Sequence, residues 1–227
     1  MSLVEKAKAV ETQKIVRAIQ QSGKNMWYYN QNQIQRMKIQ KNEFKTKPVF
    51  TANMEEFIEK VVWPFSPQIM SRNITVYIAW KNEFTCKIKT DWKMYELILF
   101  SIIQNSVKYN QFSGSIILLV DCQKRKEVPK SLKSRRRSQG SRNLKEYIFE
   151  TEIIDSGIGI EEDRQKLLFQ PFRELRAKQN MGAVKDANIG MGLACSKEIV
   201  NKLGGDIILK ESQRGLTVFA FKLPVMV

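Results

Sequence analysis

A short segment with one carboxylate and two glycines, DSGIGI, follows a stretch in which apolar and acidic residues alternate. Asp155 ends that stretch, and Gly157 and Gly159 follow it. A carboxylate at a strand end can accept a hydrogen bond from an exocyclic amine, and glycines let a flat ring approach the backbone closely. The segment therefore indicates a site for a planar molecule, although an Asp-Ser-Gly turn after a strand is common without one.

A second polar pair lies near the end of a predicted helix, in the segment QNSVKYN. Asn105 and Lys108 are three residues apart, so they share one face of the helix that we predict for residues 91–110. An amide oxygen can ligate Mg²⁺ and an ammonium group can contact phosphate, a combination that suits a magnesium nucleotide. The alternative is a helix end that becomes polar as it leaves the core.

Two further segments are weaker signals on their own. Gly190 and Gly192 precede a predicted helix, where free N–H groups and the helix dipole favour an anion. Glycine at an ordinary junction between a loop and a helix is the alternative. The segment LLFQPF is aromatic and contains proline, and by itself it indicates packing at the edge of the core.

The apolar patterns predict the elements that must position these residues. We expect helices at residues 54–63, 91–110 and 192–204 and one that begins at EEDRQKLLFQPF; strands are expected at 73–80, 84–90, 115–122 and 147–154. The first two strands would be joined by the turn KNE, and GDIILKES and GLTVFAFKLP would form a closing hairpin. The expected order is α-β-β-α-β-β-α-β-β, so single strands and helices do not alternate one for one as they do in a Rossmann fold. We therefore predict an α+β fold, an α/β sandwich whose mixed, mostly antiparallel sheet carries helices on one face.

A long helix precedes this domain. Residues 4–44 contain no proline and are rich in Lys, Gln and Asn, so we expect one helix that ends before Pro48. Its apolar residues form a narrow stripe: Val16, Ile19, Met26, Tyr29 and Ile34. So narrow a stripe cannot make a core by itself, and it predicts a partner helix in a bundle or a coiled-coil dimer.

The composition restricts the classes of function. At 227 residues and 43% hydrophobic content, the chain can bury a sizeable core, and it has no apolar run long enough to cross a bilayer. It has no histidine, which excludes an imidazole base, and its three cysteines lack the spacing of a zinc site. We expect an intracellular protein on the cytoplasmic side, with room for a membrane anchor elsewhere in a full-length protein.

Most of the net charge of +15 comes from residues 124–145, which hold ten Lys and Arg against the single acid Glu127. This segment could be a nuclear-import or polyanion-binding patch, or a target for a basophilic kinase at Ser138. It could equally be a solvated insertion between two strands. The segment contains no aromatic residue, which argues against a nucleic-acid partner.

In this order and at these spacings, the four segments resemble the ATP-binding domain of sensor histidine kinases, within the GHKL superfamily of gyrase, Hsp90, histidine kinases and MutL. QNSVK looks like the N box, DSGIGI the G1 box, LFQPF the F box and GMGL the G2 box, and the final hairpin also matches. Residues 18–44 resemble the second helix of the dimerisation and histidine-phosphotransfer domain. The resemblance implies a dimerisation helix at 1–46 and a Bergerat-type catalytic domain at 47–227, with a basic insertion at 124–145 and an ATP lid at 173–189.

The resemblance also implies roles for single residues. Asp155 would accept from the adenine amino group in a pocket shaped by Gly157 and Gly159, with Tyr109 against the ring. Asn105 would hold Mg²⁺ and Lys108 would meet phosphate. The remaining implied contacts to the phosphates come from Gly190, Gly192 and lid cations that include Arg176 and Lys178.

Three departures from the family pattern carry information. Ser101 stands where histidine kinases usually have a second asparagine and hydrolytic relatives have a glutamate that activates water, so self-contained ATP hydrolysis is not expected. Asn188 replaces a glycine of the G2 box, a mild change because Asn tolerates positive φ. No histidine is present to accept a phosphoryl group. Either the chain starts after the first phosphotransfer helix, which we favour, or the acceptor has been lost.

The function implied is transfer of the ATP γ-phosphoryl group to a histidine outside this chain. ATP and Mg²⁺ would be the cofactors. The partners would be an upstream phosphoacceptor helix, a response-regulator receiver domain and a second copy bound through the N-terminal helix. The alternatives are a catalytically degenerate nucleotide-binding signalling module, which Ser101 favours, and a gyrase-like ATPase, which Ser101 disfavours.

Overall fold

A mixed β-sheet forms the centre of the structure, a computed structural model that describes residues 3–50, 53–82, 87–124, 146–170 and 191–227. Its longer strands lie in the order β2 (Thr75–Trp80), β4 (Ser115–Lys124), β5 (Glu146–Asp155), β7 (Leu216–Met226) and β6 (Asp206–Gln213). The two-residue strands β3 (Lys89–Thr90) and β1 (Val49–Phe50) continue the sheet from the end of β7. Only β2 and β4 are parallel among these described pairs, so the predicted mixed and mostly antiparallel sheet is confirmed.

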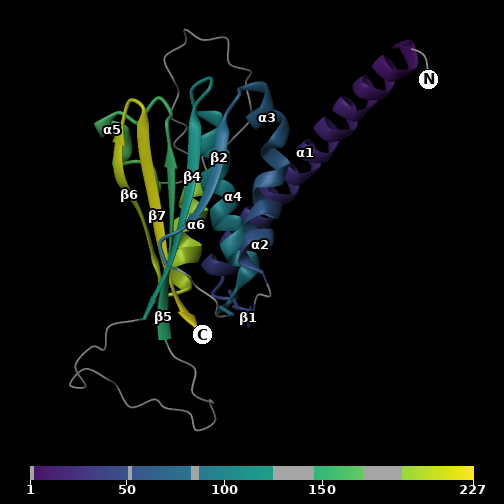
Figure 1. Ribbon diagram of the computed structural model, residues 1–227. Coiled ribbons are helices and arrows are strands. Elements are labelled where there is room, and N and C mark those ends of the chain that lie inside the picture. The colour runs from purple at the N-terminus through teal and green to yellow at the C-terminus, as the bar shows by residue number, and fades with distance from the viewer. Residues whose placement is uncertain (1–2, 51–52, 83–86, 125–145, 171–190) are drawn as a thin grey trace, which may run out of the picture.

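Helices pack against one face of this sheet (Figure 1). These helices are α2 (Met54–Val62), η1 (Trp63–Phe65), α3 (Ser66–Ser71), α4 (Trp92–Lys108) and α6 (Gly192–Lys202), whereas the short α5 (Glu162–Gln165) lies beside the end of β6. Asp91 caps α4, since its Oδ1 accepts a hydrogen bond from Met94 N at 3.2 Å. Because α4 lies between the sheet on one side and α1 and α2 on the other, it is buried nearly all round, which explains its apolar sequence.

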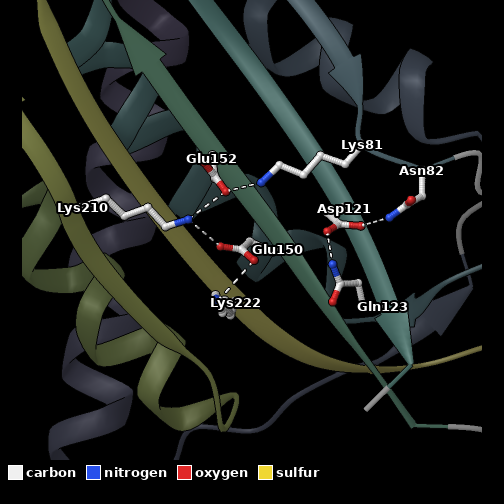
Figure 2. Close-up of polar contacts among 8 residues, drawn as sticks. All are labelled: Lys81, Asn82, Asp121, Gln123, Glu150, Glu152, Lys210 and Lys222. Atoms are coloured by element: carbon white, nitrogen blue, oxygen red, sulfur yellow. Dashed lines mark hydrogen bonds and ion pairs between the residues drawn. The ribbon is translucent and has the colours of Figure 1, made fainter. Parts of the chain in front are cut away.

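The opposite face of the sheet is charged. Glu150 and Glu152 alternate with core residues of β5, so they project to the face away from the helices. Lys210 Nζ lies 3.0 Å from Glu150 Oε1 and 2.8 Å from Glu152 Oε1. Lys81 contacts Glu152 and Lys222 contacts Glu150, which joins three strands (β5, β6 and β7) and the end of β2 in one network of ion pairs (Figure 2). These pairs explain why β5 alternates apolar and acidic residues.

The long helix α1 (Leu3–Gln40) has two parts (Figure 1). Its N-terminal part extends away from the sheet, and its C-terminal part packs against α4 and α6. The Tyr28 ring stacks on Phe100 with centroids 3.5 Å apart, and its hydroxyl donates to Glu96 at 2.5 Å. Arg36 Nε lies 3.6 Å from Glu198 on α6. Among the described residues, no helix is both long and apolar enough to span a membrane.

The apolar stripe predicted for α1 is not the face that packs. Its five residues remain 38–67% exposed, whereas Tyr28, Asn32 and Gln35 are buried. The inward face is therefore mostly polar, although Tyr28 and the partly buried Ile39 on it pack against the core. The stripe therefore stays exposed in the part of the chain that the structure describes, and its covering by another helix stays a prediction.

Three local predictions were wrong. Residues 73–80 and 84–90 do not form a hairpin: β2 pairs with β4 in parallel, and β3 pairs with β1 and β7. A parallel pair needs a crossover, which α4 supplies, and local alternation cannot reveal such a distant partner. The helix expected after residue 161 is the single turn α5, and α1 ends at Gln40 rather than near residue 44.

Candidate functional site

A cavity of about 530 Å³ lies where α1, α4 and α6 meet the loop that follows β5. Its size is within the usual range of small-molecule sites. Six of the predicted binding residues line it: Asn105, Lys108, Tyr109, Asp155, Gly159 and Gly192. Gly157 is next to these lining residues, since a Cβ there would meet Asp155 Oδ1 and Tyr109 O. Gly190, Arg176, Lys178 and the whole predicted lid fall outside the described residues.

Asp155 is the last residue of β5 and is 5% exposed. Ser106 Oγ donates to its Oδ2 at 2.8 Å, and Gly157 N donates to its Oδ1 at 3.0 Å. Burial raises the pKa of the carboxyl group above its usual value, and the two hydrogen bonds oppose that rise. Each carboxylate oxygen has one protein donor and retains acceptor capacity, so the group can take a further hydrogen bond from a molecule in the cavity.

The two glycines of the loop after β5 have a structural requirement of their own. A Cβ at Gly157 would lie 2.6 Å from Asp155 Oδ1 and 2.7 Å from Tyr109 O. Gly159 has φ +77°, and a Cβ there would lie 2.6 Å from the backbone of Gln213. The loop is thereby pressed between the end of α4 and the β6–β7 turn, and its backbone forms one wall of the cavity.

The polar end of α4 faces the cavity instead of bulk solvent. Asn105 and Lys108 are half-buried there, and Lys108 Nζ lies 5.3 Å from the centroid of the Tyr109 ring. Arg72 Nη1 donates to Val107 O at 2.7 Å and to Lys108 O, which fixes the last turn of the helix. The alternative, a helix end that turns polar on leaving the core, does not account for side chains that gather around one cavity.

Several residues of the site were missed by the sequence analysis. Ser106 is 1% exposed and holds Asp155, and its position next to Asn105 was the available signal. Thr217 of β7 pairs with Asp155 across the sheet and lines the cavity, which only strand pairing reveals. Five side chains of α1 also line the cavity: Asn25, Tyr28, Tyr29, Asn32 and Gln33. Of these five, only Tyr29 belongs to the apolar stripe, and the stripe was interpreted as a surface for a partner helix.

The polar side chains that line the cavity are better suited to a nucleotide with its magnesium ion than to a metal ion that the protein alone would hold. In the part of the chain that is described, no cluster of three His, Cys, Asp or Glu side chains could hold a metal. A cation here would instead combine amide oxygens such as that of Asn105 with oxygens of the bound molecule, as Mg²⁺ does on nucleotides. The N-terminus of α6 at Gly192 and the ammonium group of Lys108 supply positive potential for phosphates at the same cavity.

Known proteins of similar sequence include a sensor kinase/phosphatase and a sensor protein. The chain is 27% identical over 187 residues to the autoinducer 2 sensor kinase/phosphatase LuxQ of Vibrio harveyi, covering 82% of this chain and 18% of LuxQ. It is 27% identical over 160 residues to the sensor protein CiaH of Streptococcus pneumoniae, covering 69% of this chain and 30% of CiaH. The chain thus spans well under half the length of these relatives.

Solved structures show the same fold. The catalytic domain of histidine kinase ThkA superposes with a TM-score of 0.56 at 20% identity, over 79% of this chain and 96% of that domain. Full-length ShkA in complex with AMPPNP gives a TM-score of 0.65 at 16% identity, over 96% of this chain and 39% of ShkA. The fold class inferred from the sequence is therefore confirmed.

A family model described as histidine kinase-, DNA gyrase B- and HSP90-like ATPase matches residues 90–227. The matched region contains α4, the loop after β5 and the N-terminus of α6, which build the cavity together with α1. With more than half of its length matched, the chain belongs to the histidine kinase-, DNA gyrase B- and HSP90-like ATPase family.

Proposed function

We propose that this chain binds Mg²⁺-ATP in the cavity and acts as the catalytic part of a two-component sensor histidine kinase. It would pass the γ-phosphoryl group to a histidine that lies outside these residues. The observation that carries the proposal is the convergence of Asn105, Lys108 and Asp155 on one cavity in a chain of this family. Residues 47–227 would form the catalytic domain, and residues 1–46 would belong to the dimerisation and phosphotransfer region.

The proposal assigns each residue the role that the family resemblance implies. Asp155, fixed by Ser106 and Gly157, would accept the adenine amino group, and Tyr109 would lie beside the ring. Bound Mg²⁺ would neutralise developing charge on the phosphates, and Asn105 would supply an oxygen to it. Lys108 and the N-terminal amides of α6 would contact the phosphates, with Gly190, Arg176 and Lys178 as further contacts. Catalysis would then rest on positioning and electrostatics.

Calorimetric titration with a non-hydrolysable ATP analogue, with and without Mg²⁺, tests the binding half of the proposal. We expect Mg²⁺-dependent binding in the micromolar to sub-millimolar range. Replacing Asp155 by Asn removes a hydrogen bond to a charged acceptor, which costs about 1.5–3 kcal/mol, or tenfold or more in affinity. The matched control is Asp163→Asn, an exposed aspartate on α5. Equal affinities for the wild type and the two variants would refute the adenine pocket.

Phosphotransfer is tested by adding ATP and a separately expressed upstream helix that carries the acceptor histidine. Acid-labile phosphohistidine on that helix is the expected product, followed by transfer to a receiver domain. Binding without any transfer would contradict the catalytic half of the proposal while leaving the pocket intact.

The exposed stripe of α1 supports a second proposal about assembly. Val16, Ile19 and Met26 of the stripe are 46–67% exposed on one helix, an arrangement that a second copy would cover in a bundle. We therefore propose a homodimer through α1 on the cytoplasmic side of the membrane. Light scattering should give a dimer that Ile19→Asp weakens.

A further inference from the structure

The wall of the cavity formed by α1 places Asn32 beside the unusual residue Ser101. Asn32 is 8% exposed, and its Nδ2 lies 3.4 Å from Ser101 Oγ. Gly192, the first residue of α6, lies against the same serine, since a Cβ there would be 3.4 Å from Ser101 Oγ. The helices α1, α4 and α6 therefore meet at this one point of the cavity.

The hydrogen bonds of Ser101 fix the orientation of the Asn32 amide. Ser101 Oγ donates to Leu97 O at 2.9 Å, which leaves the oxygen as an acceptor only. The amide must then present its NH₂ group to Ser101, and its oxygen points away from the serine. The backbone of Asn32 is held as well, because Cys195 Sγ donates to Asn32 O at 3.2 Å.

The oxygen that points away is unpaired. Asn32 Oδ1 is buried and has no hydrogen-bond partner among the described residues, and the same holds for Asn25 Oδ1 two turns earlier. Both residues line the cavity. A buried carbonyl oxygen without a partner costs about 1–3 kcal/mol, so such an atom calls for a donor, a water or a cation at the site.

We infer that Asn32 of α1 is a ligand of the Mg²⁺–phosphate group of the nucleotide and supplies the amide that position 101 lacks. Ser101 is small enough to admit Asn32 from the neighbouring helix, whereas an asparagine at position 101 would occupy that space. The absence of the second asparagine on α4 is thereby compensated by α1. This inference rests on the proposed function and assigns α1 a direct part in the nucleotide site.

One consequence is a coupling between α1 and the nucleotide. If Asn32 contacts the Mg²⁺-nucleotide, then docking of α1 raises nucleotide affinity, and nucleotide must stabilise docking by the same free energy. A helix whose N-terminal part extends beyond the domain could in this way transmit its position to the site.

The test is calorimetric titration of the full chain with AMPPNP plus Mg²⁺ and with ADP without Mg²⁺. We expect Asn32→Ala to weaken Mg²⁺-AMPPNP binding about tenfold, as loss of one metal-supporting contact does, and to leave ADP binding without Mg²⁺ unchanged. The matched control is Asn30→Ala, an exposed asparagine on the same helix, which should bind both as the wild type does.

The decisive variant is Asn32→Ala with Ser101→Asn, which moves the amide from α1 to α4. It should recover most of the Mg²⁺-dependent affinity. A second single variant, Asn32→Asp, keeps an oxygen and should retain Mg²⁺-dependent binding, which guards against a fold defect in Asn32→Ala.

Two results would overturn the inference. One is equal affinity of Asn32→Ala and Asn30→Ala for Mg²⁺-AMPPNP. The other is an equal loss with and without Mg²⁺ that Ser101→Asn does not restore, which would mean that the pocket has simply lost its shape. Failure of the wild type to bind any nucleotide would instead refute the proposed function.

Discussion

Tyr28 is a buried aromatic contact between α1 and α4, and truncating this side chain should show how strongly α1 is held. Tyr28 is 2% exposed, and its ring stacks on Phe100 at 3.5 Å with an interplanar angle of 14°. Its hydroxyl donates to Glu96, and burial together with this carboxylate raises the tyrosine pKa, so the phenol stays protonated as a donor.

The expected cost follows from these contacts. Truncating a buried aromatic side chain to alanine costs about 3–5 kcal/mol, which includes about 0.5–1.5 kcal/mol for the ring pair. Tyr28→Phe keeps the stack and loses only the hydrogen bond to Glu96, which is partly exposed, so we expect about 1.5 kcal/mol, the lower end for a bond to a charged group. Tyr29→Ala is the matched control, because this neighbouring tyrosine is 38% exposed and should cost about 1 kcal/mol or less.

Urea unfolding followed by circular dichroism measures these differences. With a slope of about 1–3 kcal/mol per molar urea, Tyr28→Ala should lower the midpoint by about 1 M or more. If α1 detaches before the domain unfolds, the transition of Tyr28→Ala should split, with helical signal lost first. A Tyr28→Ala variant that unfolds in one step at the midpoint of Tyr29→Ala would refute the docking of α1, and with it the contact between Asn32 and Ser101.

Three further predictions concern the site and the sheet. Asp155→Asn should keep or raise the melting temperature of the nucleotide-free protein at pH 7. Burial raises the pKa of Asp155, so ionisation of the wild-type carboxyl group costs folding stability as pH rises above the unfolded value of 3.8, and the advantage of the variant should vanish at lower pH. A lower melting temperature of the variant at pH 7 would contradict this. Burial acts to raise the pKa of Glu152, but the hydrogen bonds from Lys210 and Lys81 outweigh burial and lower it, so the ionised Glu152 stabilises the fold above pH 4.5 and this contribution is lost as pH falls further. Glu152→Gln should therefore lose less melting temperature on acidification than the wild type. Equal changes of melting temperature with pH in the two proteins would refute the role of the network. Gly159→Ala should destabilise the protein by about 1–2 kcal/mol or more in thermal unfolding because φ is +77°, and a neutral effect would show that the loop can relax.

Much of the fold could be predicted from local sequence. The bounds of α4 and β5 came out within one or two residues, because periodicity, the Asp91 cap and the glycines after β5 act over a few neighbouring residues. The pairing of β2 with β4 could not be predicted in this way. It depends on a partner forty residues further along the chain, as Thr75 pairs with Ser115.

The sequence by itself determined which residue types could bind a nucleotide: one carboxylate at a strand end, an amide and an ammonium on one helix face, and glycines before a helix. Only the tertiary structure decided that α1 contributes to the same cavity. The apolar stripe of α1 pointed to the exposed face, while the buried face carries Asn32 and Gln35. A polar side chain becomes buried only when another part of the chain supplies its partners, as Ser101 does for Asn32, and that information is not local.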